Sequence, residues 1–222
     1  MNRLKTCDVM DLSSIIGHMH DTTTHHPDFP GLFQVAVGQH GYFTTFQAVE
    51  FGIGRQLLNY HAGTGRLERA YRGVYRFRDF PSGPRDEVAA AWLAVGKDFA
   101  VVSHESALDL LDLSDIIPNA IEFTIPRTKR YRKPPKGITV HSTVNPPGPR
   151  ETVVWDGFRV TSPARTIADV ADSGTSPEHV ERAVVEALDR GITSVQRLRS
   201  ATTGRGDRVR CIVEQAIDMA VA

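Results

Sequence analysis

The sequence has few cysteines, no net charge and no long apolar run. Two cysteines among 222 residues cannot form the disulfide framework of a small secreted protein, so we expect a reducing, cytoplasmic environment. The N-terminus lacks a basic start followed by an apolar stretch, and no run approaches the ~18 apolar residues of a membrane span. We therefore expect neither export nor a membrane partner. The 26 Lys and Arg balance 26 Asp and Glu, which taken whole argues against nucleic-acid binding.

The sequence also lacks the common motifs of DNA-modifying enzymes. It contains no Glu-x-Lys pair of the nuclease type and no Asp-x-Asp pair of the nucleotidyltransferase type. The run Gly204–Asp207 lacks the Lys-Ser or Lys-Thr ending of a phosphate-binding loop. Ser103, His104 and Glu105 have the residue types of a catalytic triad, but adjacent side chains at a helix start should diverge, and helix capping explains Ser103. We predict a protein that is not an enzyme, with no catalytic residue and no cofactor.

Residues 1–28 are predicted to form a flexible N-terminal arm, because they have weak periodicity and end in a polar, proline-containing stretch. The arm contains four histidines and Cys7. No two of these histidines have the i, i+4 spacing of a helical metal site, and no second cysteine lies nearby. We therefore predict no metal site.

Charge is distributed unevenly along this neutral chain. Residues 41–82 contain six Arg against three acids, a local charge of +3, and residues 127–150 contain seven basic residues and no acid. Residues 83–126, by contrast, have a net charge of −6. Because screening limits attraction to a Debye length of ~8–10 Å, local charge decides whether a polyanion binds. Zero net charge therefore does not exclude a DNA-binding face.

Residues 29–80 have the pattern of a winged helix-turn-helix domain. Apolar spacing predicts a short first helix, a second helix capped at Thr44 and a third helix from Arg55 to about Ala62. Residues 66–77 predict two short strands that fold back at a glycine. Three short helices followed by a basic hairpin are typical of a domain that binds double-stranded DNA. A module that docks only proteins, with a solvated hairpin, is the alternative.

The third helix and the hairpin supply the expected DNA contacts. Polar side chains on the outer face of this helix can pair with base edges in the major groove. A helix N-terminus and the hairpin arginines are expected to hold phosphates. The predicted contacts are Arg55, Gln56, Asn59 and Tyr60 on the third helix, Thr44 and Thr45 at the start of the second, and Arg66, Arg69, Arg72 and Arg76 on the hairpin.

A second basic segment, residues 127–136, is predicted to be a loop between two strands. We favour a second contact with DNA, because no acid interrupts the segment. Contact with an acidic surface of a partner protein, or a charged loop without a partner, are the alternatives. The candidate DNA contacts are Arg127, Lys129, Arg130, Arg132 and Lys133.

Residues 85–222 are predicted to form a mixed α+β domain, in which a small sheet is covered by helices. The linker Pro-Ser-Gly-Pro precedes this domain. Short apolar runs predict strands at 99–102, 121–125 and 138–141, and Asp156-Gly157 predicts a two-residue hairpin turn. Helices are predicted at 87–95 and 103–113, and nearly throughout the chain after Ser162. The whole chain is therefore assigned to the α+β class.

Four segments resemble AbiEi-like antitoxins, the transcriptional regulators of bacterial abortive-infection toxin–antitoxin pairs. The most specific is Gly-x-Leu-x-Arg-x-x-Arg-Gly-Val-Tyr, which begins at Gly65. The other three are Gly41–Leu58, Ser103–Ala107 and Val160–Asp169, and the resemblance covers about residues 30–220. Gly54 departs from the pattern, because relatives usually have a Ser or Thr cap there, and the third helix has one Arg where relatives often have several.

The resemblance implies a function that composition and periodicity do not. It implies that residues 85–222 neutralise a cognate toxin with a nucleotidyltransferase-like fold. It also implies that the chain represses its own operon by binding inverted repeats in the promoter. Two alternatives remain: a winged-helix regulator without a toxin partner, and a DNA-modifying enzyme, such as a nuclease, targeted by a winged helix.

Overall fold

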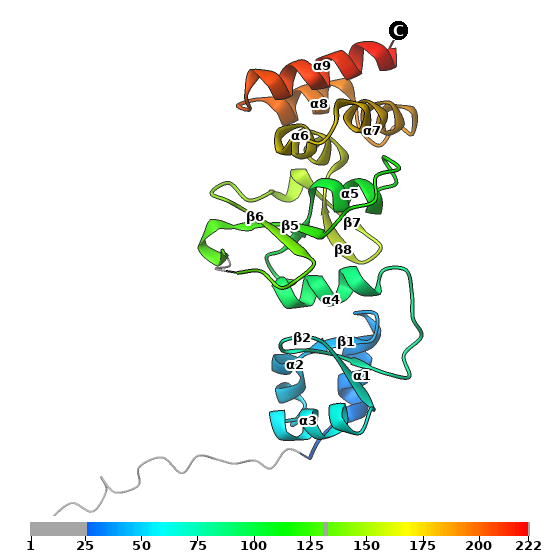
Figure 1. The fold of residues 1–222 in the computed structure, drawn as a ribbon, viewed down its shortest axis with the longest axis vertical. Helices are drawn as coiled ribbons and strands as arrows, with labels where there is room; N and C mark the ends of the chain where they lie inside the picture. The colour runs from blue at the N-terminus through cyan, green and yellow to red at the C-terminus, as the bar shows by residue number, and fades with distance from the viewer. Residues whose placement is uncertain (1–25, 131–132, 222) are drawn as a thin grey trace, which may run out of the picture.

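The computed structural model describes residues 26–130 and 133–221 and has the predicted α+β class. The molecule is elongated, with residues 29–80 at one end and the C-terminal helices at the other (Figure 1). Of the predicted arm, residues 1–25 lie outside the described residues. No helix in the described ranges is long and apolar enough to cross a bilayer.

The N-terminal part has three short helices followed by a hairpin, in the order that the sequence predicts. A three-residue strand, β1, which the sequence analysis did not predict, pairs antiparallel with β3 and completes a sheet of order β1-β3-β2. The elements are α1 (Phe29–Val37), β1 (Tyr42–Thr44), α2 (Thr45–Glu50), α3 (Arg55–Gly63), β2 (Leu67–Tyr71) and β3 (Val74–Phe77).

Local sequence signals set the boundaries of these helices. The Asp28 carboxylate accepts a hydrogen bond from the Gly31 N–H at 2.8 Å and caps α1. Thr44 and Gln47 form a reciprocal capping box that begins α2. Leu32 and Leu58 from α1 and α3 pack with neighbouring aromatic side chains into a small core of the N-terminal part.

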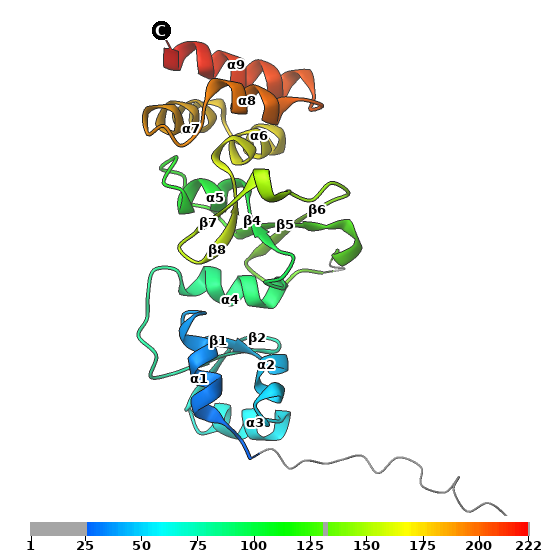
Figure 2. The same cartoon turned by 180° about the vertical axis from the view of Figure 1, so that it is seen from behind.

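Helix α4 (Asp86–Val95) lies between the N-terminal sheet and a second sheet, as both views show (Figures 1 and 2). Small and apolar side chains are buried on more than one face of this helix because it packs against both sheets. Tyr42 and Val74 belong to the same hydrophobic cluster as α4. The two predicted domains therefore share buried contacts. The buried residues of α4 are Ala89, Ala90, Ala91, Leu93 and Val95.

The second sheet has five strands in the order β6-β5-β4-β8-β7. It is mixed, because β5 runs parallel to β6 and β4 parallel to β8, while the other pairs are antiparallel. The predicted turn at Asp156-Gly157 is confirmed, with φ of 50° and 83°. The strands are β4 (Val101–Val102), β5 (Ile121–Pro126), β6 (Ile138–Thr143), β7 (Thr152–Trp155) and β8 (Phe158–Thr161).

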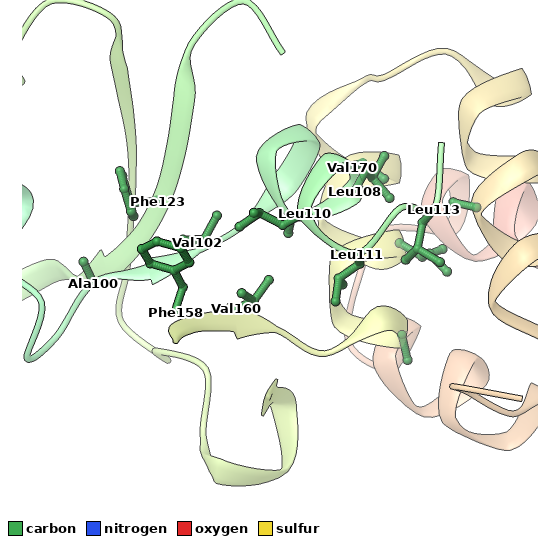
Figure 3. Close-up of a cluster of buried hydrophobic side chains, with 14 of the residues drawn as sticks. Ala100, Val102, Leu108, Leu110, Leu111, Leu113, Phe123, Phe158, Val160 and Val170 are labelled. Carbon is green, nitrogen blue, oxygen red and sulfur yellow. The ribbon is translucent and has the colours of Figure 1, made fainter. Parts of the chain in front are cut away.

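Five helices complete the C-terminal part. Side chains from α5, α6 and the sheet form one core, in which Leu108, Leu110, Phe123, Phe158 and Val170 are buried (Figure 3). The last three helices pack on α6 at the end of the molecule away from α4 (Figure 1). The helices are α5 (His104–Leu110), α6 (Pro163–Ser173), α7 (Pro177–Asp189), α8 (Val195–Thr202) and α9 (Asp207–Val221).

Candidate nucleic-acid interface

Helix α3 presents one polar face to solvent. Arg55, Gln56, Asn59 and Tyr60 are all exposed, while the opposite face buries Leu58. These four positions follow i, i+1, i+4 and i+5 spacing, which places them on one side of a helix. The structure therefore brings together the four α3 residues that the sequence predicts as a base-reading surface.

The β2–β3 hairpin carries arginines that have no carboxylate partner. Arg66, Arg69 and Arg72 are exposed, and within the described ranges none of them forms an ion pair. Arg78, just after β3, differs because its Nε lies 3.3 Å from Oε1 of Glu68. We call Arg66, Arg69 and Arg72 the hairpin arginines.

Arg76 is the fourth arginine predicted to meet phosphate, and this prediction is wrong. Its side chain is only 7% exposed, and Nη2 lies 3.2 Å from Oδ2 of Asp86. The same nitrogen donates a hydrogen bond to the Phe80 carbonyl at 2.8 Å, and the guanidinium lies 5.5 Å from the ring centroid of Tyr42. Alternation along β3 turns Arg76, like Val74, toward α4, so burial prevents a phosphate contact.

Thr44 and Thr45 are already hydrogen-bonded within the protein. Oγ1 of Thr44 accepts from the Gln47 N–H at 3.2 Å. The Thr45 N–H donates to the Gly73 carbonyl at 2.8 Å, and its hydroxyl donates to the same oxygen at 3.3 Å. These contacts tie the start of α2 to the hairpin turn. Because the N–H groups of Thr44 and Thr45 are already engaged, the structure does not support the predicted phosphate contact at the start of α2.

Helix α2 exposes two apolar side chains that the sequence analysis did not assign to the site. Phe46 is 84% exposed and Val49 is 58% exposed. In a six-residue helix the only fully buried side chain is that of Ala48. The periodicity of such a short segment does not show which apolar residues face the core.

The second basic segment lies after β5. Arg127, Lys129, Arg130 and Lys133 are exposed, and none forms an ion pair within the part of the chain that the structure describes. Nζ of Lys129 lies 5.6 Å from the ring centroid of Phe99. Both overall views place this segment on the same side of the molecule as the tip of the hairpin (Figures 1 and 2). Of the predicted contacts here, Arg132 lies outside the described residues.

The start of α5 corrects two predictions about Ser103. Its hydroxyl does not cap the helix. Instead it accepts a hydrogen bond from Oγ1 of Thr124 and lies 2.9 Å from Nδ1 of His104, so these adjacent side chains do not diverge. The Glu122 carboxylate caps the helix from β5 by accepting the Glu105 N–H at 2.8 Å. Ser103 is fully buried, which removes it from the reach of a substrate.

His104 is a buried histidine beside a second imidazole. Its ring stacks on that of His141 with 3.6 Å between centroids. Burial, with the neighbouring His141, lowers the pKa of His104 to about 4. His104 is therefore neutral near pH 7. Its backbone φ of +54° is unusual for a residue with a bulky side chain.

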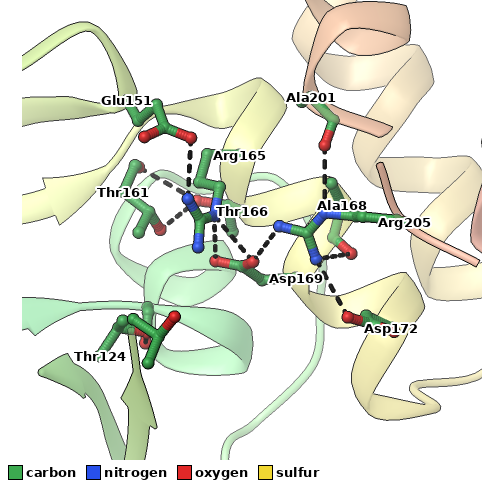
Figure 4. Close-up of polar contacts among 12 residues, drawn as sticks. Thr124, Glu151, Thr161, Arg165, Thr166, Ala168, Asp169, Asp172, Ala201 and Arg205 are labelled. Carbon is green, nitrogen blue, oxygen red and sulfur yellow. Dashed lines mark hydrogen bonds and ion pairs between the residues drawn. The ribbon is translucent and has the colours of Figure 1, made fainter. Parts of the chain in front are cut away.

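A buried ion network explains part of the Val160–Asp169 segment. Both oxygens of Asp169 accept hydrogen bonds from Nε of Arg165, at 2.9 and 3.0 Å, and Asp169 also pairs with Arg205 (Figure 4). Nη1 of Arg165 also forms an ion pair with Oε1 of Glu151 at 2.8 Å. Burial alone would lower the pKa of Arg165, but Asp169 and Glu151 raise it above its ordinary value. The network joins α6 to the segments that precede β7 and α9.

The N-terminal part of the chain is similar to a known protein family. Residues 32–78 match the family of transcriptional regulators described as AbiEi antitoxin. The match concerns the N-terminal part of the chain, and the matched residues span α3 and the hairpin. No curated protein matches the chain.

A solved structure has a similar fold over most of the chain. The crystal structure of the RV2827C protein from Mycobacterium tuberculosis superposes with a TM-score of 0.60 at 17% sequence identity. The alignment covers 90% of this chain and 80% of that chain. At this identity the likeness concerns the fold alone.

Proposed function

We propose that the chain is an antitoxin that represses its own operon and neutralises a nucleotidyltransferase-like toxin. Residues 29–80 act as a winged helix-turn-helix domain that binds promoter DNA, and residues 85–222 contact the toxin. One observation carries the DNA-binding part of the proposal. The exposed polar face of α3 and the unpaired hairpin arginines belong to one small domain.

Helix α3 is the element proposed to enter the major groove. Asn59 can bond an adenine edge through two hydrogen bonds, and Arg55 can bond a guanine edge in the same way. Gln56 and Tyr60 flank them on the exposed face. Sequence preference therefore depends on these four side chains.

The hairpin arginines are proposed to contact phosphates. Each has a free guanidinium at the protein surface, so binding DNA breaks no ion pair of the described residues. Each phosphate neutralised releases counterions, so affinity falls steeply as salt rises. The basic segment after β5 adds a second contact on the same side of the molecule (Figure 1).

A salt titration of DNA affinity tests the DNA-binding proposal. Fluorescence anisotropy would measure binding of the full-length protein to the duplex upstream of its gene. We expect log affinity to fall linearly with log salt, and the double variant Arg69→Ala/Arg72→Ala to reduce the slope by about 1.8. Arg199, which is exposed but paired with Glu214 at 3.0 Å, provides the matched control. Arg199→Ala should leave the slope unchanged, and absence of binding at low salt would refute the proposal.

Co-expression tests the antitoxin part separately. The toxin encoded by the neighbouring gene should arrest growth alone and permit growth when the full-length chain is also expressed. The Arg69→Ala/Arg72→Ala variant should still protect, since the hairpin lies in the DNA-binding part. A chain that represses transcription but does not protect would instead be a regulator without a toxin partner.

A further inference from the structure

Three metal-ligating side chains converge where α5 meets β5 and β6. They are His104 at the start of α5, Glu122 on β5 and His141 on β6. One donor atom from each lies within 4.8 Å of the other two. Nε2 of His141 and Oε1 of Glu122 are 3.2 Å apart. This cluster lies in the C-terminal part and shares no residue with the proposed DNA contacts.

The donor set fits a divalent cation of the zinc type. Two imidazoles and one carboxylate are the protein ligands of many zinc sites that keep a fourth position for water. Ligands at about 2.0–2.1 Å from a tetrahedral ion lie roughly 3.3–3.4 Å from each other. The observed 3.2 Å between Nε2 of His141 and Oε1 of Glu122 is close to that separation between ligand atoms. The stacked rings are 17° from parallel, so their nitrogen lone pairs lie in nearly parallel planes and ligation of one ion requires a ring to tilt.

Neighbouring groups already orient two of the three ligands. Oγ of Ser103 lies 2.9 Å from Nδ1 of His104, so an N–H at Nδ1 can donate to it and leave Nε2 free for a metal. The Glu105 N–H holds Oε2 of Glu122 at 2.8 Å and leaves Oε1 toward His141. Such supporting hydrogen bonds are typical of metal ligands in proteins.

The cluster is accessible to solvent and ions. His104 and His141 line a cavity of ≈ 550 Å³ together with Thr124 and Asp169. Glu122 and His141 also line a neighbouring cavity of ≈ 360 Å³. Water therefore has a route to a fourth coordination position. The left-handed backbone of His104, with φ of +54°, is a local strain of the kind found at functional sites.

We propose that His104, Glu122 and His141 bind one zinc-type divalent cation and that water occupies the remaining coordination position. The ion would join α5 to the parallel pair β5 and β6, three segments whose sequence positions are far apart. This proposal differs from the sequence-based expectation of no metal site. That expectation considered only the histidines of the N-terminal arm.

Metal titration of the full-length protein tests the proposal. The protein would be stripped with a chelator and titrated with Zn²⁺ alone, followed by calorimetry, and with Co²⁺, followed by its visible absorption. We expect one equivalent per chain for the unaltered protein. Glu122→Gln and His141→Gln should each lose that equivalent, while circular dichroism shows that the fold is retained.

Two controls separate this site from other histidines. His179 pairs with Asp115 at 3.5 Å in the same part of the molecule but is not in the cluster, so His179→Gln should still bind one equivalent. A variant with all four histidines of residues 1–28 replaced by Gln should also bind it. Ser103→Ala, which removes the hydrogen bond to His104, should weaken binding about 10- to 100-fold.

Three results would overturn the proposal. The first is no stoichiometric binding by the unaltered protein. The second is full binding by both Glu122→Gln and His141→Gln. The third is loss of the equivalent only in the variant that lacks the histidines of the arm. If one cluster variant fails to fold, the other variant and the unaltered protein still decide the question.

Discussion

Arginines serve different purposes in the two parts of the molecule. In the N-terminal part, Arg69 and Arg72 are exposed and lack carboxylate partners among the described residues. In the C-terminal part, Arg165 and Arg205 are both only 15% exposed and converge on Asp169. The first arrangement leaves charge available to a polyanion, and the second uses charge to join segments of the fold. The difference shows that arginine content alone does not locate a binding face.

Arg76 lies on the hairpin but resembles the structural arginines of the C-terminal part in its environment. It belongs to the hairpin by sequence but to the structural group by environment, because it faces α4 and pairs with Asp86. The face of the sheet, rather than position along the chain, decides which use applies. Four substitutions test this division and the role proposed for α3, from the largest expected effect to the smallest.

Asp169→Ala is expected to have the largest effect. Removing the shared carboxylate leaves two largely buried guanidinium groups without their main partner, which costs about 3–5 kcal/mol of unfolding free energy. Chemical denaturation would measure this loss. The control Asp115→Ala removes an exposed partner of Arg182 and should have no measurable effect. Equal loss in both variants would contradict the structural role of the network.

Arg76→Ala is expected to lower stability without changing the salt dependence of DNA binding. The substitution leaves the partly buried Asp86 carboxylate unpaired, which costs about 1.5–3 kcal/mol. Denaturation and anisotropy on the same sample would separate the two effects. A reduced salt slope with unchanged stability would place Arg76 with the hairpin arginines instead.

Asn59→Ala is expected to alter preference at a single base pair. Loss of a pair of hydrogen bonds to one base costs about 1–3 kcal/mol of discrimination there and leaves other positions unchanged. Competition with a panel of duplexes that differ at one position would detect it. Glu50→Ala, at the end of α2, is an exposed control that should retain the preference of the unaltered protein.

Arg130→Ala is expected to have the smallest effect. If the segment after β5 contacts one phosphate through this side chain, the salt slope falls by about 0.9 and stability is unchanged. The comparison with Arg69→Ala/Arg72→Ala shows how binding is divided between the two basic surfaces. An unchanged slope, together with weaker protection against the toxin, would assign the segment to the protein partner.

The sequence predicts elements with strong local signals and misses those that depend on distant contacts. The helix cap at Thr44 and the Asp156-Gly157 turn are local, and both are confirmed. Strand β1 has three residues, too few for periodicity, and its pairing with β3 joins positions about thirty residues apart. For the same reason, the sequence does not predict that Glu122 on β5 caps α5.

The residues of the candidate sites also divide into those that local spacing predicts and those that depend on distant contacts. The exposed face of α3 follows from helical spacing, because α3 contacts the core on one side only. The environment of Arg76 depends on α4, which packs on the sheet from beyond the linker. The His104–Glu122–His141 cluster joins three elements that no sequence spacing connects.

Helix α4 limits where the protein can be divided. Its side chains are shared by both sheets, so cutting the chain after residue 80 would expose Tyr42, Val74 and Arg76 to water. The N-terminal part therefore depends on α4 to cover these side chains. Because α4 packs between the two sheets, it sets the spacing between the hairpin and the basic segment after β5 (Figure 1).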